Sequence, residues 1–366
     1  MKKRITLVTW LGYGNYGTSL QSFALYQKLQ SLGCEVCFLS HYSKFCTTTV
    51  LAWIKNVLLH IRFYSPFFYL FSAKGRKLKR FHSEKYKIRT ALTSYGQKQI
   101  LDNTDVFVAG SDQIWNVSHA YSPFMFLDFA QDKKRVAYAS SIGTNEIEEG
   151  YKTLVKKHLQ KFHSIAVREK TAVKTLNDLL EEEKVVQVLD PTFLLSASEW
   201  KCLANEATFD YELPEKYALC YFIGNNSEYK SQLAEILSKG NIQHCIVIPS
   251  EESPDIELGD YLYDHKAGPK EFIQLIAKAE IVCTDSFHAT TISTILSKQF
   301  VVFKRFSDKD KKSQNSRIYD ILELTGLLDR FFPCDINSKI NYERVHHVLD
   351  VERRKSEEYI VNNIVT

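Results

Sequence analysis

A histidine that follows a short apolar segment and opens an amphipathic one is the residue best placed to do chemistry in this chain. His288 ends the run Thr284-Asp-Ser-Phe-His, between the apolar segment 281–284 and the helix-like segment 289–297. A strand-to-helix turn presents its side chains at the edge of a sheet, where ligands bind. An imidazole has a pKa near neutrality, so it can both donate and accept a proton and contribute about 10²–10⁴ in rate. We expect His288 to be catalytic together with Asp285, which either orients the imidazole or, as we favour, caps the helix.

A glycine-rich turn near the N-terminus predicts a second ligand-facing group. The run Gly12-Tyr-Gly-Asn-Tyr-Gly17 stands between a strand-like and a helix-like segment. The amides and the positive dipole end of that helix would point at an anion or a sugar. A GxGxxG pattern is present, but no acidic residue follows about 20 positions later, which argues against a dinucleotide site. We expect Gly14, Asn15 and Gly17 to contact a sugar acceptor.

A third polar group follows the apolar segment 106–110. Asp112, Gln113 and Asn116 carry carboxylate and amide groups, which make directional hydrogen bonds with sugar hydroxyls. Trp115 either stacks on a pyranose face or packs in the core beside the apolar segment. These four residues are our candidates for binding a sugar.

The segments that hold these residues alternate between strand-like and helix-like patterns. The apolar segments end in polar residues, and they lie at 5–10, 35–40, 106–110, 135–141, 164–167, 185–189, 217–224, 244–249, 281–284 and 300–303. This alternation predicts an α/β fold of two Rossmann-like domains that face a cleft, as in GT-B glycosyltransferases, with the site at the carboxyl ends of the strands. A polar C-terminal helix completes the chain.

The length of 366 residues favours two domains of ordinary size. We expect an N-terminal domain at 1–204 that binds the acceptor, with an insertion at 44–100, and a C-terminal domain at 205–341 that binds the donor. The helix at 342–366 is expected to pack back on the N-terminal domain.

Aromatic and basic residues alternate between positions 53 and 89, where the cations greatly outnumber the acids. One interpretation is a peripheral contact with anionic lipid or with a lipid-linked acceptor. The other is a solvated helix whose aromatic face packs on the protein, and aromatic stripes more often belong to a core.

Composition excludes several classes of protein. Apolar residues make up 45% and charged residues 25% of the chain, and the net charge is only +4, so nucleic acid is not an expected partner. The cysteines are scattered and partly within strand-like segments, which favours free thiols over disulfides. Cys34 and Cys37 form a CxxC without a second pair at zinc spacing, so we expect no metal. Lacking a signal-like or spanning segment, the chain is expected to be cytoplasmic.

Several motifs, in this order, resemble the landmarks of the polysaccharide pyruvyl transferase family from residue 5 to about residue 330. They are Gly-Asn-Tyr-Gly-Thr at 14–18, Leu-Gln at 20–21, Ala-Leu at 24–25, Gly-Ser-Asp-Gln-Ile-Trp-Asn at 110–116, Val-Arg-Glu at 167–169, Asp-Pro-Thr at 190–192, Asp-Ser-Phe-His at 285–288 and Asn-Ser-Arg-Ile at 315–318.

The resemblance implies transfer of a pyruvyl group from phosphoenolpyruvate to a sugar of a cell-surface polysaccharide or its precursor, usually as a ketal, with release of phosphate. It implies no cofactor and no obligatory metal. Phosphoenolpyruvate carries a carboxylate and a phosphate, so arginines, lysines and helix N-termini should hold it. Its C3 must gain a proton while a sugar hydroxyl loses one, and His288 is suited to both steps.

One position departs from the family pattern. Some members carry an arginine two residues before the histidine, where this chain has Ser286. We assign donor binding to Arg168, Ser286, Lys304, Arg305 and Arg317. Arg317 is our choice to replace the missing arginine, because it follows a polar loop at 307–313 that could close over the cleft.

Two other classes of function stay open at this point. A GT-B glycosyltransferase with a nucleotide-sugar donor would need a carboxylate for the ribose, and Glu251, Glu252 and Glu271 are available. A non-catalytic carbohydrate-binding protein would tolerate the loss of His288. The sequence leaves the sugar and the oligomeric state undecided.

Overall fold

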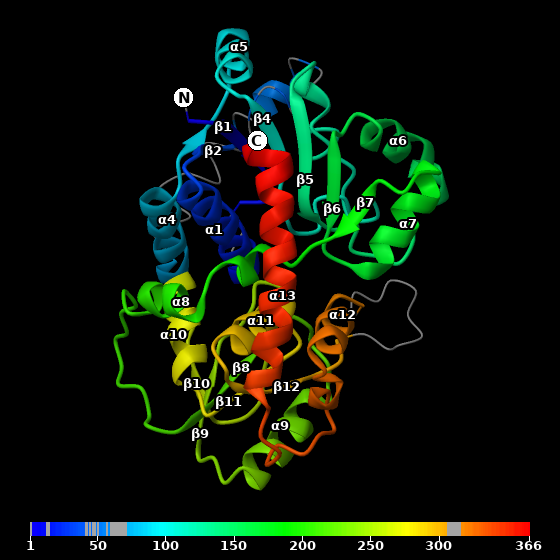
Figure 1. The fold of residues 1–366 in the computed structure, drawn as a ribbon. Coiled ribbons are helices and arrows are strands. Elements are labelled where there is room, and N and C mark those ends of the chain that lie inside the picture. The colour runs from blue at the N-terminus through cyan, green and yellow to red at the C-terminus, as the bar shows by residue number, and fades with distance from the viewer. Residues whose placement is uncertain are drawn as a thin grey trace.

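The structure is a computed structural model that describes residues 2–11, 15–40, 43, 45, 49, 51–55, 58, 72–305 and 316–366. Its described residues form two halves, each built around a parallel β-sheet (Figure 1). The predicted loop at 307–313 and the candidate residue Gly14 lie outside the described residues.

The sheet of the N-terminal half has the strand order β3-β2-β1-β4-β5-β6-β7, and all neighbours are parallel. Its strands are β1 (Arg4–Val8), β2 (Glu35–Leu39), β3 (Ile88–Arg89), β4 (Val106–Ala109), β5 (Lys134–Ser140), β6 (Ser164–Val167) and β7 (Val185–Gln187). The strand order reverses at β1: β2 and β3 follow on one side of this strand, and β4 to β7 follow on the other. Ligands of such sheets bind at the carboxyl ends of the strands near this point.

The helices of this half connect the parallel strands. In the described part of the chain they include α1 (Tyr16–Ser31), α4 (Ala73–Lys85), α5 (Ser94–Asp102), α6 (Glu149–Leu159) and α7 (Lys170–Leu180), with the short turn η2 (Asp128–Ala130). Asn15 begins α1, because its side-chain oxygen accepts hydrogen bonds from the amides of Gly17 at 2.8 Å and Thr18 at 3.4 Å.

The C-terminal half repeats the topology with a smaller sheet of order β10-β9-β8-β11-β12, also all parallel. Its strands are β8 (Tyr217–Tyr221), β9 (His244–Val247), β10 (Leu262–Tyr263), β11 (Ile281–Thr284) and β12 (Gln299–Val302). The helices are α9 (Tyr229–Lys239), α10 (Pro269–Lys278), α11 (Phe287–Ile295) and α12 (Ser316–Thr325), with the turn η4 (Leu328–Arg330).

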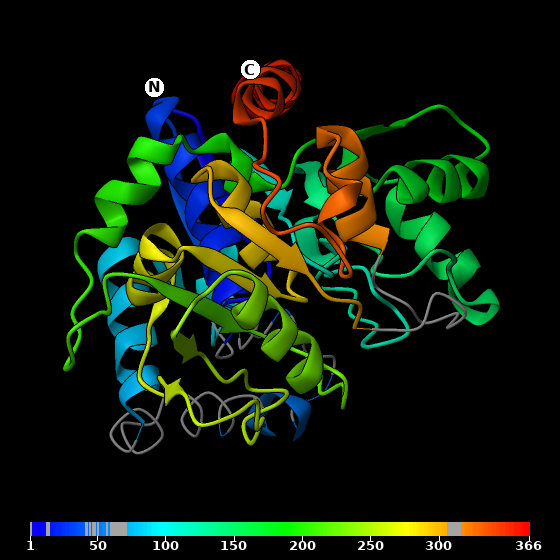
Figure 2. The same ribbon diagram turned by 90° about the horizontal axis from the view of Figure 1, so that it is seen from below.

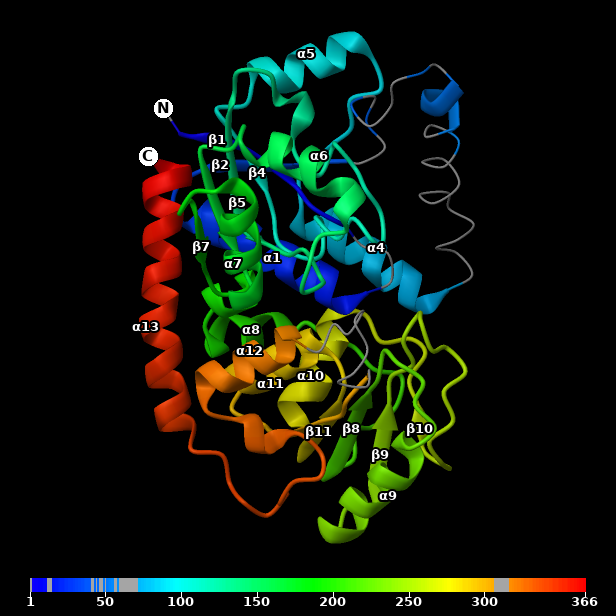
Figure 3. The same cartoon turned by 90° about the vertical axis from the view of Figure 1, so that its right-hand side faces the viewer.

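Two segments connect the halves. After β7 the chain passes through η3 (Pro191–Leu194) and α8 (Ala197–Ala204), and α8 packs against α10. The last helix, α13 (Tyr342–Ile360), continues as η5 (Val361–Val365) and runs along both halves (Figures 1 and 3). Viewed from below, α13 is seen end-on at the edge of the molecule (Figure 2).

Specific contacts hold α13 against the first half. Tyr359 donates a hydrogen bond to the carbonyl of Ala137 at 2.9 Å, and Ser356 accepts one from the amide of Leu189 at 2.9 Å. Both partners belong to the N-terminal half, so α13 covers it although it begins beside the other half. The domain boundaries at 204 and 341 stay a prediction.

Tyr16, at the start of α1, is buried between the two halves. Its ring stacks on Phe272 of α10 at 4.4 Å and meets Tyr221 edge-on at 5.5 Å, while its hydroxyl donates to the carbonyl of Ala267 at 2.8 Å. The hydrophobic core around these rings runs without interruption from β1 to α13. The halves are therefore packed together through the first helix.

Three lysines of α4 form ion pairs with acidic residues outside this helix. Lys74 pairs with Glu251 at 2.9 Å, and Lys77 pairs with Glu271 at 3.0 Å, so α4 is linked to the second half. Lys85 pairs with Glu206 at 2.9 Å. This favours the interpretation that the described end of the basic segment packs on the protein, and a lipid contact stays a prediction.

The sequence patterns located most of these elements. The strand at 281–284 has the predicted bounds, whereas several others end one to three residues earlier than predicted. The edge strands β3 and β10 were not predicted, because two residues are too few to show a periodic pattern.

Candidate active site

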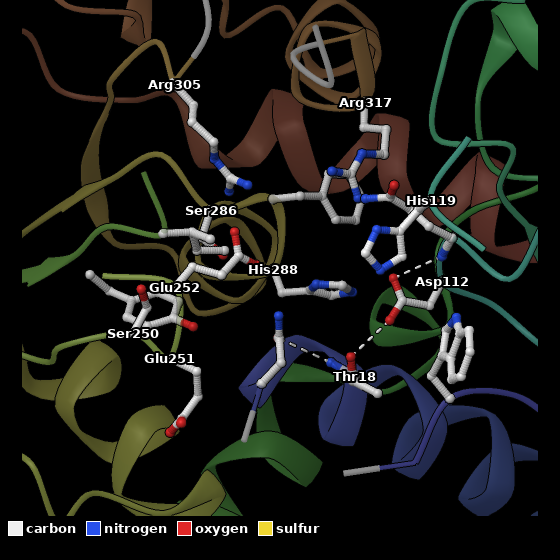
Figure 4. Close-up of a pocket in the computed structure, with 16 residues that line it drawn as sticks. Thr18, Asp112, His119, Ser250, Glu251, Glu252, Ser286, His288, Arg305 and Arg317 are labelled. Atoms are coloured by element: carbon white, nitrogen blue, oxygen red, sulfur yellow. Dashed lines mark hydrogen bonds between the residues drawn. The ribbon is translucent and has the colours of Figure 1, made fainter. Parts of the chain in front are cut away.

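A cavity of about 570 Å³ lies between the two halves, at the carboxyl ends of both sheets (Figure 4). Its lining residues come from both halves and are Trp10, Asn15, Thr18, Asp112, Gln113, His119, Tyr221, Ile223, Ser250, Glu251, Glu252, Ser286, Phe287, His288, Arg305 and Arg317. The position agrees with the site of ligands in doubly wound sheets.

His288 lies near the centre of this cavity, in the first turn of α11 (Figure 4). The helix begins at Ser286, whose hydroxyl accepts a hydrogen bond from the amide of Ala289 at 3.4 Å. The buried strand β11 ends two residues earlier, so the turn is short and the imidazole is fixed at the sheet edge.

Gly17 of α1 lies directly against the imidazole of His288. A Cβ at position 17 would overlap this ring, 2.6 Å from its Cγ and closer still to Nδ1. Real Cβ atoms do not approach other atoms this closely, so only glycine leaves the space beside Nδ1 open. The structure thus brings two predicted site residues from different halves into contact.

Asp285 is not placed as we expected. Its carboxylate accepts hydrogen bonds from the amides of Ile223 at 2.6 Å and Gly224 at 2.7 Å and from the hydroxyl of Tyr229 at 2.9 Å. It also pairs with Arg305 at 3.3 Å. The helix cap is Ser286, so both expected roles of Asp285 are corrected: the carboxylate ties β11 to the end of β8.

The carboxylate beside His288 belongs instead to Asp190, from the first half. Its Oδ2 lies 3.7 Å from Nε2 of His288 and 2.8 Å from Nη1 of Arg168. Burial raises the pKa of Asp190, but His288, Arg168 and the amide of Thr192 outweigh burial and hold this pKa far below its usual range. Asp190 is therefore an anion at every physiological pH.

Arg168 is buried behind this carboxylate and does not line the main cavity. It pairs with Glu169 at 3.2 Å and with Asp190 at 2.8 Å. Burial lowers its pKa, and the two carboxylates more than reverse this, so the pKa is raised above its usual value. The expected clamp on a donor is corrected: in this structure Arg168 is the counter-cation of Asp190 and Glu169.

Two other predicted cations do line the cavity. Arg305 and Arg317 extend into it from the same side of His288 (Figure 4). Burial, with the nearby positive charges of Arg168 and Arg305, lowers the pKa of Arg317 to about 10, so it stays protonated near neutrality. Ser286 lines the cavity too, whereas Lys304 does not and lies with Nζ 5.9 Å from the ring centre of Tyr319.

The opposite wall carries Asp112 and Thr18. The hydroxyl of Thr18 donates to Oδ2 of Asp112 at 2.8 Å, and the amide of Gln113 donates to its Oδ1 at 2.9 Å. Asp112 has a φ of 78°, in the left-handed region that aspartate tolerates better than most residues. Its carboxylate is thereby held at the cavity edge.

Among the other predicted sugar-binding residues, Asn15 and Gln113 line the cavity. Asn116 is buried behind them and donates from Nδ2 to Oε1 of Gln113 at 2.8 Å, so it orients that amide. No room remains for a side chain at Gly143, where a Cβ would meet Asn116 and Gln113.

Trp115 is only 2% exposed and does not line the cavity. Its ring stacks on Phe126 at 5.5 Å, and its Nε1 donates to the carbonyl of Met125 at 3.1 Å. The expected stacking on a sugar is therefore corrected, and the alternative of a core tryptophan agrees with the structure.

Sequence reasoning missed several residues of the site. Asp190 and Thr18 stand within quoted motifs, so a signal was present, but nothing in their local sequence showed which residues they would meet. His119, Tyr221 and Ser250 also line the cavity and belong to no quoted motif.

Among the described residues, no group of three or more His, Cys, Asp and Glu side chains could hold a metal ion. Within the same part of the chain, no helix is long and apolar enough to cross a membrane.

The two Rossmann-like halves, with a ligand cavity between them, define a protein of the GT-B-like class. The family model of the polysaccharide pyruvyl transferases matches residues 15–305. The chain belongs to this family, which implies a polysaccharide acceptor.

Solved structures share the fold at low sequence identity. A glycosyltransferase from Rickettsia africae ESF-5 is 12% identical with a TM-score of 0.50, and the match covers 99% of both chains. A putative UDP-N-acetylglucosamine 2-epimerase from Listeria monocytogenes is 12% identical with a TM-score of 0.49, covering 100% of this chain and 92% of that chain. The first likeness confirms the predicted fold class and says nothing about substrates. No curated protein sequence matches significantly.

Proposed function

We propose that the chain transfers a pyruvyl group from phosphoenolpyruvate to two hydroxyls of a sugar, forming a ketal and releasing phosphate. The observation that carries this proposal is the position of His288 beside Arg305 and Arg317 in one cavity. The sugar belongs to a polysaccharide or its precursor, as the family implies.

The arginine pair suits a donor with two anionic groups. Guanidinium groups bind carboxylates and phosphates with charge-assisted, often bidentate hydrogen bonds. Arg317 is buried near two other arginines, and burial together with these like charges lowers its pKa. A bound anion would relieve the crowding, so this part of the cavity favours an anionic ligand.

The reaction needs two kinds of proton transfer near one carbon. The proton of the imidazolium moves to C3 of phosphoenolpyruvate, and the oxygen of a sugar hydroxyl forms a bond to C2 while its proton returns to the imidazole. The C2–O bond to phosphate then breaks, and the second hydroxyl adds to C2. Its proton leaves with the phosphate, so atoms and charges balance.

The acceptor would lie on the opposite wall. Thr18 and the adjacent amide fix the carboxylate of Asp112, and Asn116 orients Gln113. Pre-oriented carboxylate and amide groups are typical partners of sugar hydroxyls. The first half therefore supplies the acceptor site and the second half the donor site.

The proposal is tested by incubating the protein with phosphoenolpyruvate and a panel of free, nucleotide-linked, lipid-linked and polymeric sugars while phosphate release is measured. Release that requires both substrates and falls at least 100-fold in His288→Gln supports it. Phosphate release that is independent of acceptor, or unaffected in His288→Gln, contradicts it.

A glycosyltransferase with a nucleotide-sugar donor is the second candidate. Glu251 and Glu252 follow β9 and line the cavity, where a carboxylate could bind a ribose. Glu251 is already paired with Lys74 at 2.9 Å, and this leaves Glu252 as the candidate. Transfer of sugar from a nucleotide-sugar in the same panel, lost in Glu252→Gln, would favour this function.

A further inference from the structure

The imidazole of His288 faces the carboxylate of Asp190, which belongs to the other half of the molecule. Asp190 follows β7 and its side chain is completely buried, while His288 opens α11. The contact between Oδ2 and Nε2 therefore joins the two halves at the centre of the site.

Four hydrogen bonds fix the carboxylate of Asp190. Oδ1 accepts from the amide of Thr192 at 3.0 Å and from its hydroxyl at 2.7 Å. Oδ2 accepts from the hydroxyl of Ser111 at 3.1 Å and from Nη1 of Arg168 at 2.8 Å. The carboxylate is thus held in one orientation, with Oδ2 directed at His288.

The nitrogen that faces Asp190 is incompletely satisfied. Nε2 of His288 is buried and has no hydrogen-bond partner among the described residues. The separation of 3.7 Å exceeds the usual length of about 2.7–3.2 Å for such a bond. A buried polar group without a partner is unfavourable, so a small movement that closes this gap is favourable.

The other ring nitrogen faces a space that the fold keeps open. Nδ1 lies beside Gly17, where any side chain would fill the space next to it. The two nitrogens therefore have different surroundings: Nε2 faces a buried anion, and Nδ1 faces the start of α1 at the cavity.

We propose that Asp190 is the positioning residue of His288: its Oδ2 accepts a hydrogen bond from Nε2–H and thereby leaves Nδ1 to exchange protons with the substrate. The identity of that substrate rests on the proposed function. When a hydroxyl of the acceptor loses its proton to Nδ1, the oxygen keeps the electron pair and bonds to C2 of the donor. The imidazolium so formed keeps its Nε2–H toward the negative charge of Asp190, which stabilises it.

The same network accounts for the burial of Arg168 and Glu169. Asp190 needs a buried counter-cation, because an uncompensated buried carboxylate is strongly unfavourable. Arg168 supplies it, and the same guanidinium pairs with Glu169 at 3.2 Å. A pairing role, rather than contact with the donor, accounts for the burial of both residues.

The test uses the full chain labelled with ¹⁵N in its histidine rings, and nuclear magnetic resonance reports the tautomer of His288. The signal is assigned by its loss in His288→Gln. We expect the neutral wild-type ring to carry its proton on Nε2. In Asp190→Asn we expect more of the neutral ring to carry its proton on Nδ1, because an amide is a weaker acceptor for Nε2–H than a carboxylate. Asp320→Asn removes another carboxylate at the boundary between the halves and serves as the matched control, without this change.

A proton on Nδ1 of the neutral wild-type ring, or an unchanged tautomer ratio in folded Asp190→Asn, overturns the proposal. The wild-type tautomer needs no variant, so it decides the question even if Asp190→Asn does not fold. The readout also needs no substrate. Failure of phosphate release in wild type would refute only the proposed reaction. The resonance data test only the hydrogen bond between Asp190 and His288.

Kinetics supply a second readout once a substrate is known. Asp190→Asn should lower kcat by at least 10-fold with little change in the KM of either substrate, and Asp190→Glu should recover part of kcat. A change confined to KM would contradict a positioning role.

Discussion

Gly17 and His288 touch across the boundary between the two halves, so the start of the first helix forms part of the surroundings of the candidate catalytic imidazole. A Cβ at Gly17 would lie 2.6 Å from Cγ of His288. The glycine is required by this close approach, since its φ does not fall in the left-handed region. Substitution of Gly17 is therefore expected to reduce activity as strongly as substitution of a catalytic side chain.

Gly17→Ala should therefore reduce kcat/KM by at least 100-fold, because the methyl group displaces the imidazole or the start of α1. The measurement is steady-state phosphate release, alongside thermal unfolding. Gly150→Ala is the matched control: it lies in α6 with nothing within 4 Å of the added methyl, and it should keep full activity. Wild-type kinetics in Gly17→Ala would show that the ring has room to move.

Arg317→Ala should raise the KM for phosphoenolpyruvate by about 10–100-fold, the loss expected for a charge-assisted hydrogen bond. Arg317→Lys should recover only part of it, since a lysine cannot bind an anion in a bidentate manner. The exposed Arg354 on α13 provides the control Arg354→Ala. An unchanged donor KM in Arg317→Ala would remove this residue from the donor site.

Asp285→Asn should destabilise the protein by about 3–5 kcal/mol, because it breaks a buried ion pair and turns an amide toward hydrogen-bond donors. Urea unfolding measures this loss. Asp255→Asn, at an exposed carboxylate, should be neutral. A stable but inactive Asp285→Asn would instead restore the catalytic role that the sequence suggested.

His82, on α4, should make stability depend on pH. Burial lowers its pKa to about 4, and its Nε2 lies 3.2 Å from Oγ of Ser19. An unfolded histidine titrates near 6.5, so below that pH the unfolded state binds a proton that the native state does not. The contribution is complete above pH 6.5 and is lost as the pH falls toward 4.

Between pH 7 and pH 5, wild type should therefore lose about 2 kcal/mol more of its unfolding free energy than His82→Phe does. Urea titrations at both pH values measure the difference, and the exposed His119 gives the control His119→Asn. Equal losses in wild type and His82→Phe would show that His82 does not titrate in this range.

The sequence predicted the parts of the site that local patterns determine. His288 and Arg305 follow strands β11 and β12 within a few residues, and the carboxyl ends of parallel strands lie at one edge of a sheet. Arg317 lies in the first turn of α12 and was predicted from the polar loop before it. The cap of α11 was misplaced by one residue, because aspartate and serine are almost equally good caps. The competing partners of Asp285 lie just after β8 and on α9.

The rest depends on contacts between distant segments. Asp190 meets His288 only because the two halves are packed together, and no spacing in the sequence encodes that distance. Trp115 follows an apolar strand, where a tryptophan can face either a ligand or the core. Trp115 packs in the core, where it stacks on Phe126, and this contact depends on how the loop after β4 folds back.

The burial of Tyr16 between the halves bears on whether either half can be expressed separately. Its ring is completely buried among residues of the second half, although it begins the first helix of the first half. A fragment that ends at residue 204 would leave this ring, and the face of α1 around it, in water. Because one continuous core includes residues of both halves, we expect the two halves to unfold together. Dissection into separately expressed halves should therefore yield insoluble pieces, and inactive variants are best compared in the intact chain.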